Sequence, residues 1–261
     1  MKKIPQDITG TIAILKFPRK MWKITKKLQA RKFLKNHKNV TTVVEKTEGF
    51  SGKLRIPRMN YLAGIKTTIA QYKENDCTFE FDINKTYFSP RLSEERKKTA
   101  EEVIKSIKKK SSKILVLFAG IAPYPIVIAK KLKKQKISSH IFVNELNKDA
   151  NKFAEKNIRK NKVGQYITLA PGDAKTISNK LKEKFDIILM TRPNLKNTFL
   201  KEILPLTKKG TKIFYHGFGI KEEVTKEIKK DIGTKIKNIE LRKAGDIGAY
   251  KYRWLASFEI K

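Results

Sequence analysis

The stretch Lys113-Ile-Leu-Val-Leu-Phe-Ala-Gly120 decides the fold class of this chain of 261 residues. An apolar run that ends in a glycine turn is typical of a buried strand in a doubly wound α/β domain, where a nucleotide-type cofactor binds at the carboxyl end of the strand. Pro123 and Pro125 follow, and they suit the first turn of a helix because a missing N–H costs little there. We therefore predict a strand, a cofactor loop and a helix in this order.

Downstream of this run, strand-like and helix-like segments alternate. Strands are predicted at 113–118, 140–144, 166–169, 185–190 and 211–216, and helices at 124–134, 147–160, 196–203 and 220–230. This alternation indicates a parallel sheet with helices on both faces. The last two β-rich runs, 235–242 and 250–259, have no helix between them, which favours an antiparallel pair at the sheet edge.

The part of the chain before this run has shorter segments. The pattern predicts a strand over 8–17, a basic helix over 21–36 and short strands at 41–45, 53–56 and 67–72. Residues 77–83 alternate apolar and polar side chains, which predicts a half-buried strand with Glu80 and Asp82 on its polar side. An apolar stripe with helical spacing then predicts a helix that joins two domains. We expect a small α/β domain over 1–90, a linking helix over 91–110 and the doubly wound domain over 111–261.

Charge is the second strong feature, because 60 Lys and Arg stand against 25 Asp and Glu, a formal net charge of +35. Such a field favours a polyanionic partner, since neutralising phosphates releases counterions. A lysine-rich solvated surface, as in thermophilic proteins, would give the same composition. The lysines are spread along the whole chain, so we expect nucleic acid to bind the folded body rather than a basic tail.

The cysteine and histidine content limits which disulfides and metal sites the chain can form. Cys77 is the single cysteine of the sequence, which excludes an internal disulfide and a cysteine-rich zinc site and favours a reducing cytoplasm. His37, His140 and His216 are too scattered to predict a metal site. No stretch approaches a transmembrane span, and the first residues lack the apolar core of a signal peptide. We expect no metal and no membrane attachment.

Three features in order predict the cofactor site. Gly120 lets the backbone approach a ligand, and about 25 residues later Glu145 ends a predicted strand, where a carboxylate can hold both ribose hydroxyls. Gly172-Asp173-Ala174 ends another strand region and could bracket an adenine. NAD and S-adenosylmethionine both fit this set. Ala122 replaces a glycine of the full GxGxxG pattern, a loss that a cofactor without phosphate tolerates better.

A charged helix start precedes the cofactor loop. In Tyr87-Phe-Ser-Pro-Arg-Leu-Ser-Glu-Glu-Arg96, two acids follow Ser93 and suit the N-terminal dipole of a helix, which by itself explains Glu94 and Glu95. Arg96 differs, because it falls inside the apolar stripe, which a purely solvated residue would avoid. We therefore expect Arg96 to have a buried partner or a ligand.

Five motifs match a known family. They are Gly52-Lys-Leu-Arg55, Tyr87-Phe-Ser-Pro-Arg-Leu-x-x-Glu95-Arg96, Leu117-Phe-Ala-Gly120, Asn144-Glu-Leu-Asn147 and Gly172-Asp173. The chain resembles the archaeal and eukaryotic tRNA guanine-37 N1-methyltransferase family, including members that act in wyosine biosynthesis, over nearly its whole length. The resemblance implies a class I, Rossmann-like, S-adenosylmethionine-dependent methyltransferase domain, preceded by a small α/β domain that helps hold the anticodon stem-loop of tRNA.

The resemblance also implies roles for individual residues. Glu95 would be the general base that removes the N1 proton of guanine, and Arg55 would hydrogen-bond O6, where a guanidinium stabilises the negative charge left on the base. The cofactor would be bordered by Tyr87, Arg96, Phe118, Gly120, Glu145, Leu146, Asp173, Ala174, Thr191 and Pro193. Of these, Glu145 and Leu146 would hold the ribose and adenine.

The chain departs from the family pattern in three places. Val116 stands where the family has an acid, Ala122 stands where it has a second loop glycine, and Thr191-Arg192-Pro193 replaces Asn-Leu-Pro or Asn-Pro-Pro. We expect altered cofactor affinity, with Thr191 keeping a hydrogen-bonding group. The chain begins where the second domain of the family begins, so we expect the domain that senses the outer corner of tRNA to be absent, its role partly taken by positive charge.

Three functions follow as alternatives. The first is methyl transfer to N1 of guanine-37 in tRNA, with or without methylation of a tricyclic wyosine precursor at the same position. The second is aminocarboxypropyl transfer from the same cofactor, against which the intact Ser89-Pro90-Arg91 and Glu95 count. The third is a non-catalytic RNA-binding module, prompted by the departures at the cofactor loop. We predict the first, in a monomeric cytoplasmic enzyme.

Overall fold

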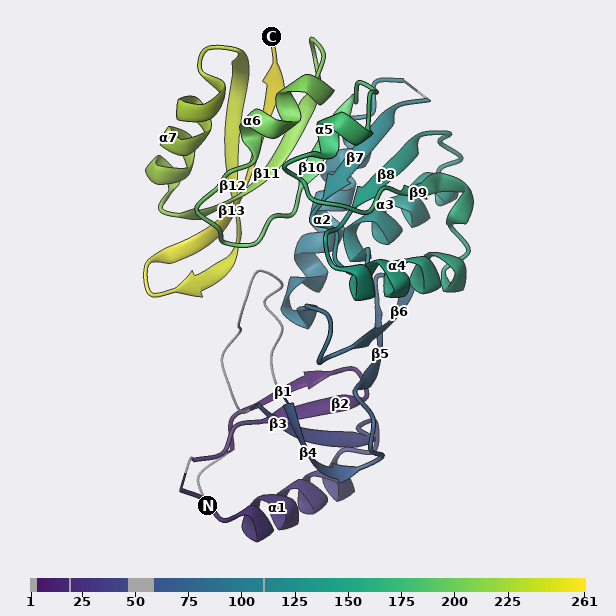
Figure 1. Ribbon diagram of the computed structural model, residues 1–261, viewed down its shortest axis with the longest axis vertical. Coiled ribbons are helices and arrows are strands. Elements are labelled where there is room, and N and C mark those ends of the chain that lie inside the picture. The colour runs from purple at the N-terminus through teal and green to yellow at the C-terminus, as the bar shows by residue number, and fades with distance from the viewer. Residues whose placement is uncertain (1–3, 19, 47–58, 110) are drawn as a thin grey trace.

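The computed structural model of the protein describes residues 4–18, 20–46, 59–109 and 111–261. Figure 1 shows a small sheet with one helix near the N-terminus, a larger layered part that holds the C-terminus, and a hairpin between them. The strand predicted at 53–56 and the candidate Arg55 lie outside the described residues.

The larger part is built on a seven-stranded sheet with the strand order β12-β13-β11-β10-β7-β8-β9. Its strands are β7 (Lys113–Leu117), β8 (His140–Asn144), β9 (Ile167–Leu169), β10 (Ile187–Met190), β11 (Lys212–Gly219), β12 (Ile236–Gly248) and β13 (Lys251–Ile260). The first five are parallel, and β13 lies antiparallel between β11 and β12. The strand order reverses at β7, which is where an open α/β sheet binds its ligands. The predicted parallel sheet and antiparallel edge pair are confirmed.

Helices cover both faces of this sheet because successive side chains of a strand point to opposite faces. Ile114 and Val116 of β7 pack with helices α2, α3 and α4, whereas Leu115 and Leu117 pack with α5, α6 and α7. The helices are α2 (Ser93–Lys105), α3 (Pro123–Lys134), α4 (Lys148–Lys160), α5 (Ile177–Lys180), α6 (Leu200–Ile203) and α7 (Lys221–Ile232). Single 3-10 turns lie at Pro90–Leu92, Gly164–Tyr166 and Leu204–Leu206.

Two helix predictions are too long. The helix predicted over 91–110 is a 3-10 turn followed by α2, which ends at Lys105. The helix predicted over 196–203 is only the single turn α6, because the chain after β10 runs through Pro193 and reaches Phe199 with a left-handed φ of 60°. This irregular segment keeps the loop after β10 at the carboxyl edge of the sheet.

The small part has a four-stranded sheet in the order β1-β2-β3-β4, with bounds Gln6–Thr9, Ile12–Leu15, Thr42–Lys46 and Met59–Gly64. Helix α1 (Lys23–Asn36) covers the face that carries Ala13 and Val43. The single strand predicted over 8–17 is wrong, because the chain turns at Gly10 with a φ of 58° and forms the hairpin β1–β2. Strand β4 was not predicted.

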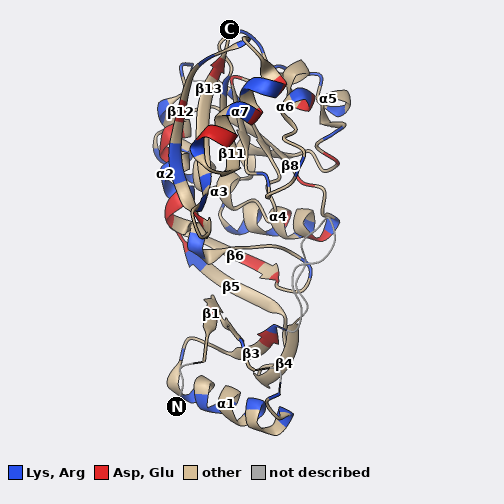
Figure 2. Cartoon of the chain, turned by 90° about the vertical axis from the view of Figure 1, so that its left-hand side faces the viewer, with Lys and Arg blue, Asp and Glu red and all other residues tan. Residues whose placement is uncertain are grey.

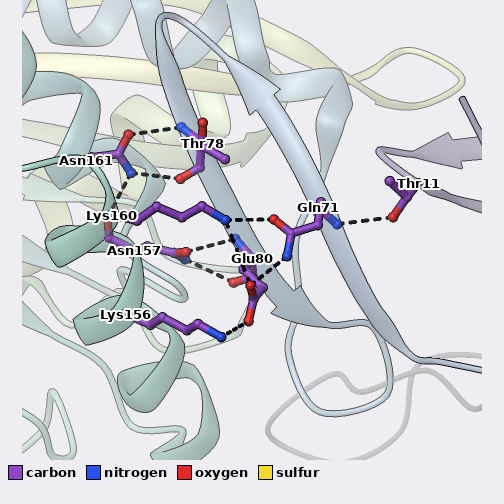
Figure 3. Close-up of polar contacts among 8 residues, drawn as sticks. All are labelled: Thr11, Gln71, Thr78, Glu80, Lys156, Asn157, Lys160 and Asn161. Carbon is purple, nitrogen blue, oxygen red and sulfur yellow. Dashed lines mark hydrogen bonds and ion pairs between the residues drawn. The ribbon is translucent and has the colours of Figure 1, made fainter.

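Strands β5 (Ile69–Glu74) and β6 (Cys77–Asp82) form a separate hairpin between the two sheets (Figure 1). Figure 3 shows how α4 holds it: the Asn157 side chain accepts from the Glu80 amide at 2.8 Å and donates to its carbonyl at 3.1 Å, and Asn161 pairs with the backbone of Thr78 in the same way. On its other side, the Thr11 hydroxyl accepts from the Gln71 amide at 3.3 Å.

The prediction of a half-buried β6 is wrong, because its polar side is covered as well. Glu80 is only 8% exposed and Asp82 only 7%. The Glu80 carboxylate accepts from Lys156 and Gln71, so its charge is neutralised where α4 crosses the hairpin (Figure 3). These partners lie far along the chain, and a local pattern does not reveal them.

Positive charge extends over the whole molecule. Figure 2 shows lysines and arginines on α1 of the small part and on α2, α6 and α7 of the large part. Helix α1 carries no acidic residue in its first turn and has the basic Lys35 in its last turn. Within the described ranges, no helix has the length and apolar composition needed to cross a membrane.

Candidate active site

The loop after β7 has a tightly curled backbone. Phe118, Gly120 and Ala122 have φ angles of 59°, 57° and 66°, the left-handed region that favours glycine. Ala122 is fully buried at the start of α3. A side chain in this conformation costs about 1 kcal/mol, which explains why a glycine suits this position better. The loop therefore keeps the curled form despite the departure from the glycine pattern.

Glu145 closes this loop from the end of β8. Its Oε2 accepts from the Gly120 amide at 2.7 Å and its Oε1 from the Asn147 amide at 2.8 Å. Burial raises the pKa of Glu145 above its ordinary value, although these backbone N–H groups oppose the rise. Each carboxylate oxygen can accept a second hydrogen bond, so Glu145 is able to bind hydroxyl groups while it holds the loop.

The loops after β8 and β9 are tied together. Asn144 donates through Nδ2 to the carbonyls of Ala170 and Gly172, both at 2.9 Å. The Gly172 amide donates to the Glu145 carbonyl at 3.0 Å. Asp173 is exposed beside them, and Ala174 is buried. The structure thus brings Gly120, Glu145 and the 172–174 segment to one edge of the sheet.

The loop after β10 completes this edge. The Thr191 hydroxyl lies 3.0 Å from the Leu117 carbonyl and 3.1 Å from the Phe118 carbonyl, and it donates to both in a shared hydrogen bond. Thr191 therefore fixes the first residue of the curled loop. Pro193 is half-buried two residues later. The Phe118 ring meets the Phe199 ring edge to face at 4.9 Å.

The segment before α2 lies against the same edge. Asn147 donates through Nδ2 to the Lys85 carbonyl at 2.7 Å. A Cβ built on Gly120 would lie 3.7 Å from the carbonyl oxygen of Tyr87. Tyr87 is 44% exposed and Leu146 is 46% exposed. Two large apolar surfaces are thus open to solvent next to the Glu145 carboxylate.

Glu95 lies in the first turn of α2 and is 7% exposed. Its Oε2 accepts from Nη1 of Arg242 at 2.6 Å, and its Oε1 accepts from Nη2 of Arg242 at 3.0 Å and from the Thr99 hydroxyl at 2.8 Å. Arg242 belongs to β12, and its Nε donates to Glu102 at 2.6 Å. Burial lowers the pKa of Arg242, but its hydrogen bonds and charge interactions with both acids outweigh that and raise it.

Two buried polar side chains accompany Glu95. Nε2 of His216 lies 4.0 Å from Oε1 of Glu95, and the His216 ring meets the Tyr124 ring edge to face at 5.8 Å. Burial, followed by the charges of Arg253, Arg242 and Arg192, holds the pKa of His216 well below its usual value. His216 is therefore neutral at pH 7, and the short separation is not an ion pair. His216 Nε2 and the Tyr124 hydroxyl have no hydrogen-bond partner among the described residues.

Glu95 also faces the cofactor loop. Tyr124 lies in the first turn of α3, two residues after Ala122, and is 5% exposed. Burial raises the pKa of Tyr124, and the charge of Glu95 raises it further. The His216 ring contacts Tyr124 and lies near Glu95, so it links the candidate base to the start of α3.

Arg96 is bound by protein groups on the inner side of α2. Its guanidinium is enclosed, with 2% of the side chain exposed, and it donates to both carboxylate oxygens of Glu74 and to the Ser89 carbonyl. It also lies 4.8 Å over the Phe88 ring. The expected buried partner exists, and it is an acid of the hairpin β5–β6 rather than a ligand.

Sequence patterns missed Arg242, His216 and Tyr124. Arg242 lies 147 residues from Glu95 along the chain, and in the sequence His216 was considered only as a metal ligand. The only available signal was a histidine and an arginine inside segments predicted as strands. Among the described residues, no group of three or more His, Cys, Asp or Glu side chains is placed to hold a metal ion.

The residues at this edge fit an adenosine-containing cofactor. Glu145 offers a half-buried carboxylate for vicinal hydroxyls, Leu146 offers an open apolar face for a base, and Gly120 permits close backbone approach. Ala122 stands where a second glycine would let a pyrophosphate approach the backbone closely. The donor set suits a cofactor without phosphate.

Comparison with known proteins identifies the family. Residues 68–242 match the family described as the TRM5/TYW2 methyltransferase domain, and this range covers more than half of the chain. The chain belongs to the TRM5/TYW2 methyltransferase family. The match begins at β5 and ends on Arg242, so it includes the hairpin, α2 and every loop of the candidate site.

TRM5/TYW2 relatives are similar over nearly the whole chain. The tRNA (guanine(37)-N(1))/4-demethylwyosine(37)-methyltransferase Taw22 of Nanoarchaeum equitans is 33% identical over 303 residues, 95% of this chain and 96% of the relative. The crystal structure of Trm5b from Pyrococcus abyssi is 28% identical with a TM-score of 0.78, over 98% of this chain and 75% of that one. The complex structure of aTrm5 and tRNALeu has a TM-score of 0.82 at 21% identity, over 99% and 72% of the two chains, and shows the shared fold.

Proposed function

We propose that this chain transfers a methyl group from S-adenosylmethionine to N1 of guanine-37 in tRNA. The observation that carries the proposal is the buried Glu95 carboxylate, which pairs with the partly exposed guanidinium of Arg242. The names of the Nanoarchaeum and Pyrococcus relatives support the same reaction.

The chemistry requires a base. N1 of guanine carries a proton at neutral pH and becomes a good nucleophile only when that proton leaves. Bound S-adenosylmethionine supplies an electrophilic methyl group. Glu95 takes the N1 proton on a carboxylate oxygen, a step in which a positioned base contributes about 10²–10⁴ in rate. Thr99 holds the carboxylate through Oε1 at 2.8 Å, so the group is oriented for this transfer.

The cations around Glu95 favour guanine that has lost its N1 proton. Loss of the N1 proton leaves negative charge on O6 of guanine, and fixed positive groups in a water-poor site stabilise such charge. Arg192, Arg242 and Arg253 all act on His216 next to Glu95. Arg55 is proposed from the family resemblance as the direct O6 partner. Replacement by Ala should then slow chemistry more than it weakens cofactor binding.

The cofactor is proposed to lie across the carboxyl ends of β7, β8, β9 and β10. Glu145 would accept from the ribose hydroxyls, and the adenine would lie between Leu146 and the segment of Asp173 and Ala174. The remaining border is formed by Tyr87, Phe118, Gly120, Thr191 and Pro193. Arg96 is left out of this proposal because Glu74 and Ser89 enclose its guanidinium.

The tRNA is proposed to bind the lysine-rich surface of both parts. The net charge of +35 gives a long-range field that attracts a polyanion. Binding that neutralises phosphates falls steeply with added salt. Substituting surface lysines in contact with tRNA should flatten the dependence of affinity on salt concentration, and an unchanged slope would place the contacts elsewhere.

The decisive experiment is incubation of the protein with S-adenosylmethionine and unmodified tRNA, followed by mass spectrometry of the nucleosides. We expect a mass gain of one methyl group on guanosine, only in tRNA with guanine at position 37. A matched tRNA with adenine at position 37 is the control. A larger gain would indicate aminocarboxypropyl transfer, and no gain despite tight cofactor binding would contradict the proposal.

A second candidate is methylation of the tricyclic wyosine precursor at the same position. The double name of the Nanoarchaeum equitans relative, which is similar over 96% of its length, favours it. The test is the same incubation with tRNA that carries this precursor. A methyl gain on the tricyclic base would add the second activity, and its absence would limit the enzyme to guanine.

Other features stay predictions. These are the domain division into 1–90, 91–110 and 111–261, the monomeric state and the cytoplasmic location. The attachment of Thr78 and Glu80 to α4 supports a boundary before Ile69 instead of at residue 90. Limited proteolysis would locate the boundary.

A further inference from the structure

The candidate base already has a partner that blocks its task. Both carboxylate oxygens of Glu95 accept from Arg242, at 2.6 Å from Nη1 and 3.0 Å from Nη2. Oε1 of Glu95 already accepts two hydrogen bonds, from Arg242 and Thr99, and Oε2 accepts one from Arg242. A substrate with two parallel donors cannot bind both oxygens while Arg242 holds them. The contact must therefore change before a guanine edge binds both oxygens of Glu95.

Arg242 occupies the open side of Glu95. The Arg242 side chain is 32% exposed, whereas the Glu95 side chain is 7% exposed. Thr99 and His216 lie against Glu95 on its buried side. A nucleobase that arrives from solvent therefore meets the Arg242 guanidinium before it reaches the Glu95 carboxylate.

The two competing groups have the same donor pattern. A guanidinium presents two N–H groups on a planar N–C–N unit to the two oxygens of a carboxylate. The Watson–Crick edge of guanine presents N1–H and an N2–H on the same planar N–C–N unit. Adenine, by contrast, has an unprotonated N1 and no amino group at C2. Arg242 thus gives Glu95 the hydrogen bonds that guanine, and not adenine, can replace.

A second carboxylate can stay paired with Arg242 after guanine displaces its guanidinium from Glu95. Nε of Arg242 donates to Glu102 at 2.6 Å, and Glu102 is 35% exposed. Glu102 lies seven residues after Glu95 on the same helix, so both acids face β12. The guanidinium can turn away from Glu95 while its charge stays paired.

We infer that Arg242 is a placeholder for guanine: its guanidinium holds Glu95 in the geometry of the substrate complex and is displaced by the N1–C2–N2 edge of the target base. Arg242 is a positioning residue on this account. The inference rests on the proposed function, because it takes guanine as the base that Glu95 meets.

The test compares equilibrium affinities for tRNA with guanine-37 and for the same tRNA with adenine-37, without S-adenosylmethionine so that no turnover occurs. The adenine tRNA reports all contacts outside the Glu95 site. In Arg242→Met the competitor is gone, so we expect the ratio of the two affinities to rise by about tenfold or more. Lys237→Met, which removes a more exposed cation from the same strand, is the control and should leave the ratio unchanged.

A rescue measurement separates this role from a merely structural one. In Arg242→Ala, added methylguanidinium should fill the place of the side chain and bring the affinity ratio back toward the wild-type value. Sodium chloride at equal ionic strength should not. If Arg242→Met fails to fold, Arg242→Lys serves, because an ammonium keeps the charge but loses the planar pair of donors, and an intermediate ratio is expected.

An unchanged or lower ratio in Arg242→Met, or equal effects of methylguanidinium and sodium chloride, would overturn the inference. Failure of the proposed function appears differently, as absence of guanosine methylation by the wild-type protein. Affinity without cofactor and methylation with cofactor are thus independent readouts.

Discussion

Glu95 and Arg96 are neighbours in α2, and each forms a paired-donor ion pair with a residue from a β hairpin, yet the two pairs differ in their surroundings. Arg96 and Glu74 are each 2% exposed, and further contacts to Ser89 and Phe88 close the site around them. Glu95 is similarly buried, but Arg242 is 32% exposed. One pair is sealed, and the other is open on one side.

The difference teaches how one helix turn serves two purposes. Removing a partner from a sealed pair leaves an uncompensated buried charge, so such a pair fixes structure. An open pair can exchange one partner for a ligand of equal hydrogen-bonding pattern. The Arg96 pair therefore joins α2 to the hairpin β5–β6, while the Glu95 pair has one partly exposed partner that a ligand can replace.

The largest effect is expected for the open pair of Glu95 and Arg242. Glu95→Gln should reduce methylation by about 10²–10⁴ because the amide cannot take a proton. Binding of tRNA should stay nearly unchanged, as measured by filter binding beside single-turnover rates. Glu94→Gln, at the exposed neighbouring acid, is the control and should keep its rate. Equal loss of binding and rate in Glu95→Gln would refute the assignment of the base.

The next effect tests the sealed side. Arg96→Met should lower the free energy of unfolding by about 3–5 kcal/mol, since it leaves Glu74 buried without its cation. Denaturant unfolding measures this change. The double variant Arg96→Met with Glu74→Leu should recover much of the loss, because no charge then stays buried. A loss as small as that of the exposed control Lys97→Met would show that the pair is not sealed in solution.

A smaller effect is expected where α4 holds the same hairpin. Asn157→Ala removes the acceptor of the Glu80 amide and the donor to its carbonyl, both buried. Leaving these backbone groups unpaired should cost about 1–3 kcal/mol in unfolding free energy. Lys156→Ala breaks only a half-exposed contact to Glu80 and should cost at most about 1 kcal/mol. Equal costs would mean that side-chain charge, and not the backbone contact, holds the hairpin.

The smallest effect sharpens the electrostatics of the open pair. The pKa of His216 is lowered in the fold, so between that pKa and its ordinary value near 6.5 the unfolded chain binds one more proton than the folded chain. Stability should therefore fall as pH drops below about 6.5, by at most about 1.4 kcal/mol per pH unit. His216→Phe should flatten the curve relative to the wild type. Identical slopes in urea unfolding would contradict a neutral His216.

The sequence revealed what depends on local order. Apolar runs and loop glycines located β7 and its loop, and the acid after β8 was correctly placed near Gly120. The motif match located Glu95 within a charged helix start that capping alone could explain. Each of these features lies within a few consecutive residues, and strand and helix geometry determine its pattern.

The rest depends on contacts between distant segments. In the sequence, Glu80 has the pattern of a solvent-facing strand residue. In the structure it is covered by α4, where its partner Lys156 lies 76 positions further along the chain. Arg242 reads as an ordinary strand residue until the sheet edge brings it to Glu95. Gly10 lies inside an apolar run that looks continuous, and only the three-dimensional turn shows why the run is broken. No local period contains this information.

The turn at Gly10 has a consequence for engineering. A Cβ on Gly10 would lie 1.7 Å from the Gln71 carbonyl oxygen, so two backbones meet here without room for a side chain. The tilt of the small sheet relative to the hairpin is therefore set by direct backbone contact rather than by a flexible tether. A chimera that takes its N-terminal sheet from a relative would need glycine at this point, or the small sheet would be displaced from the hairpin β5–β6.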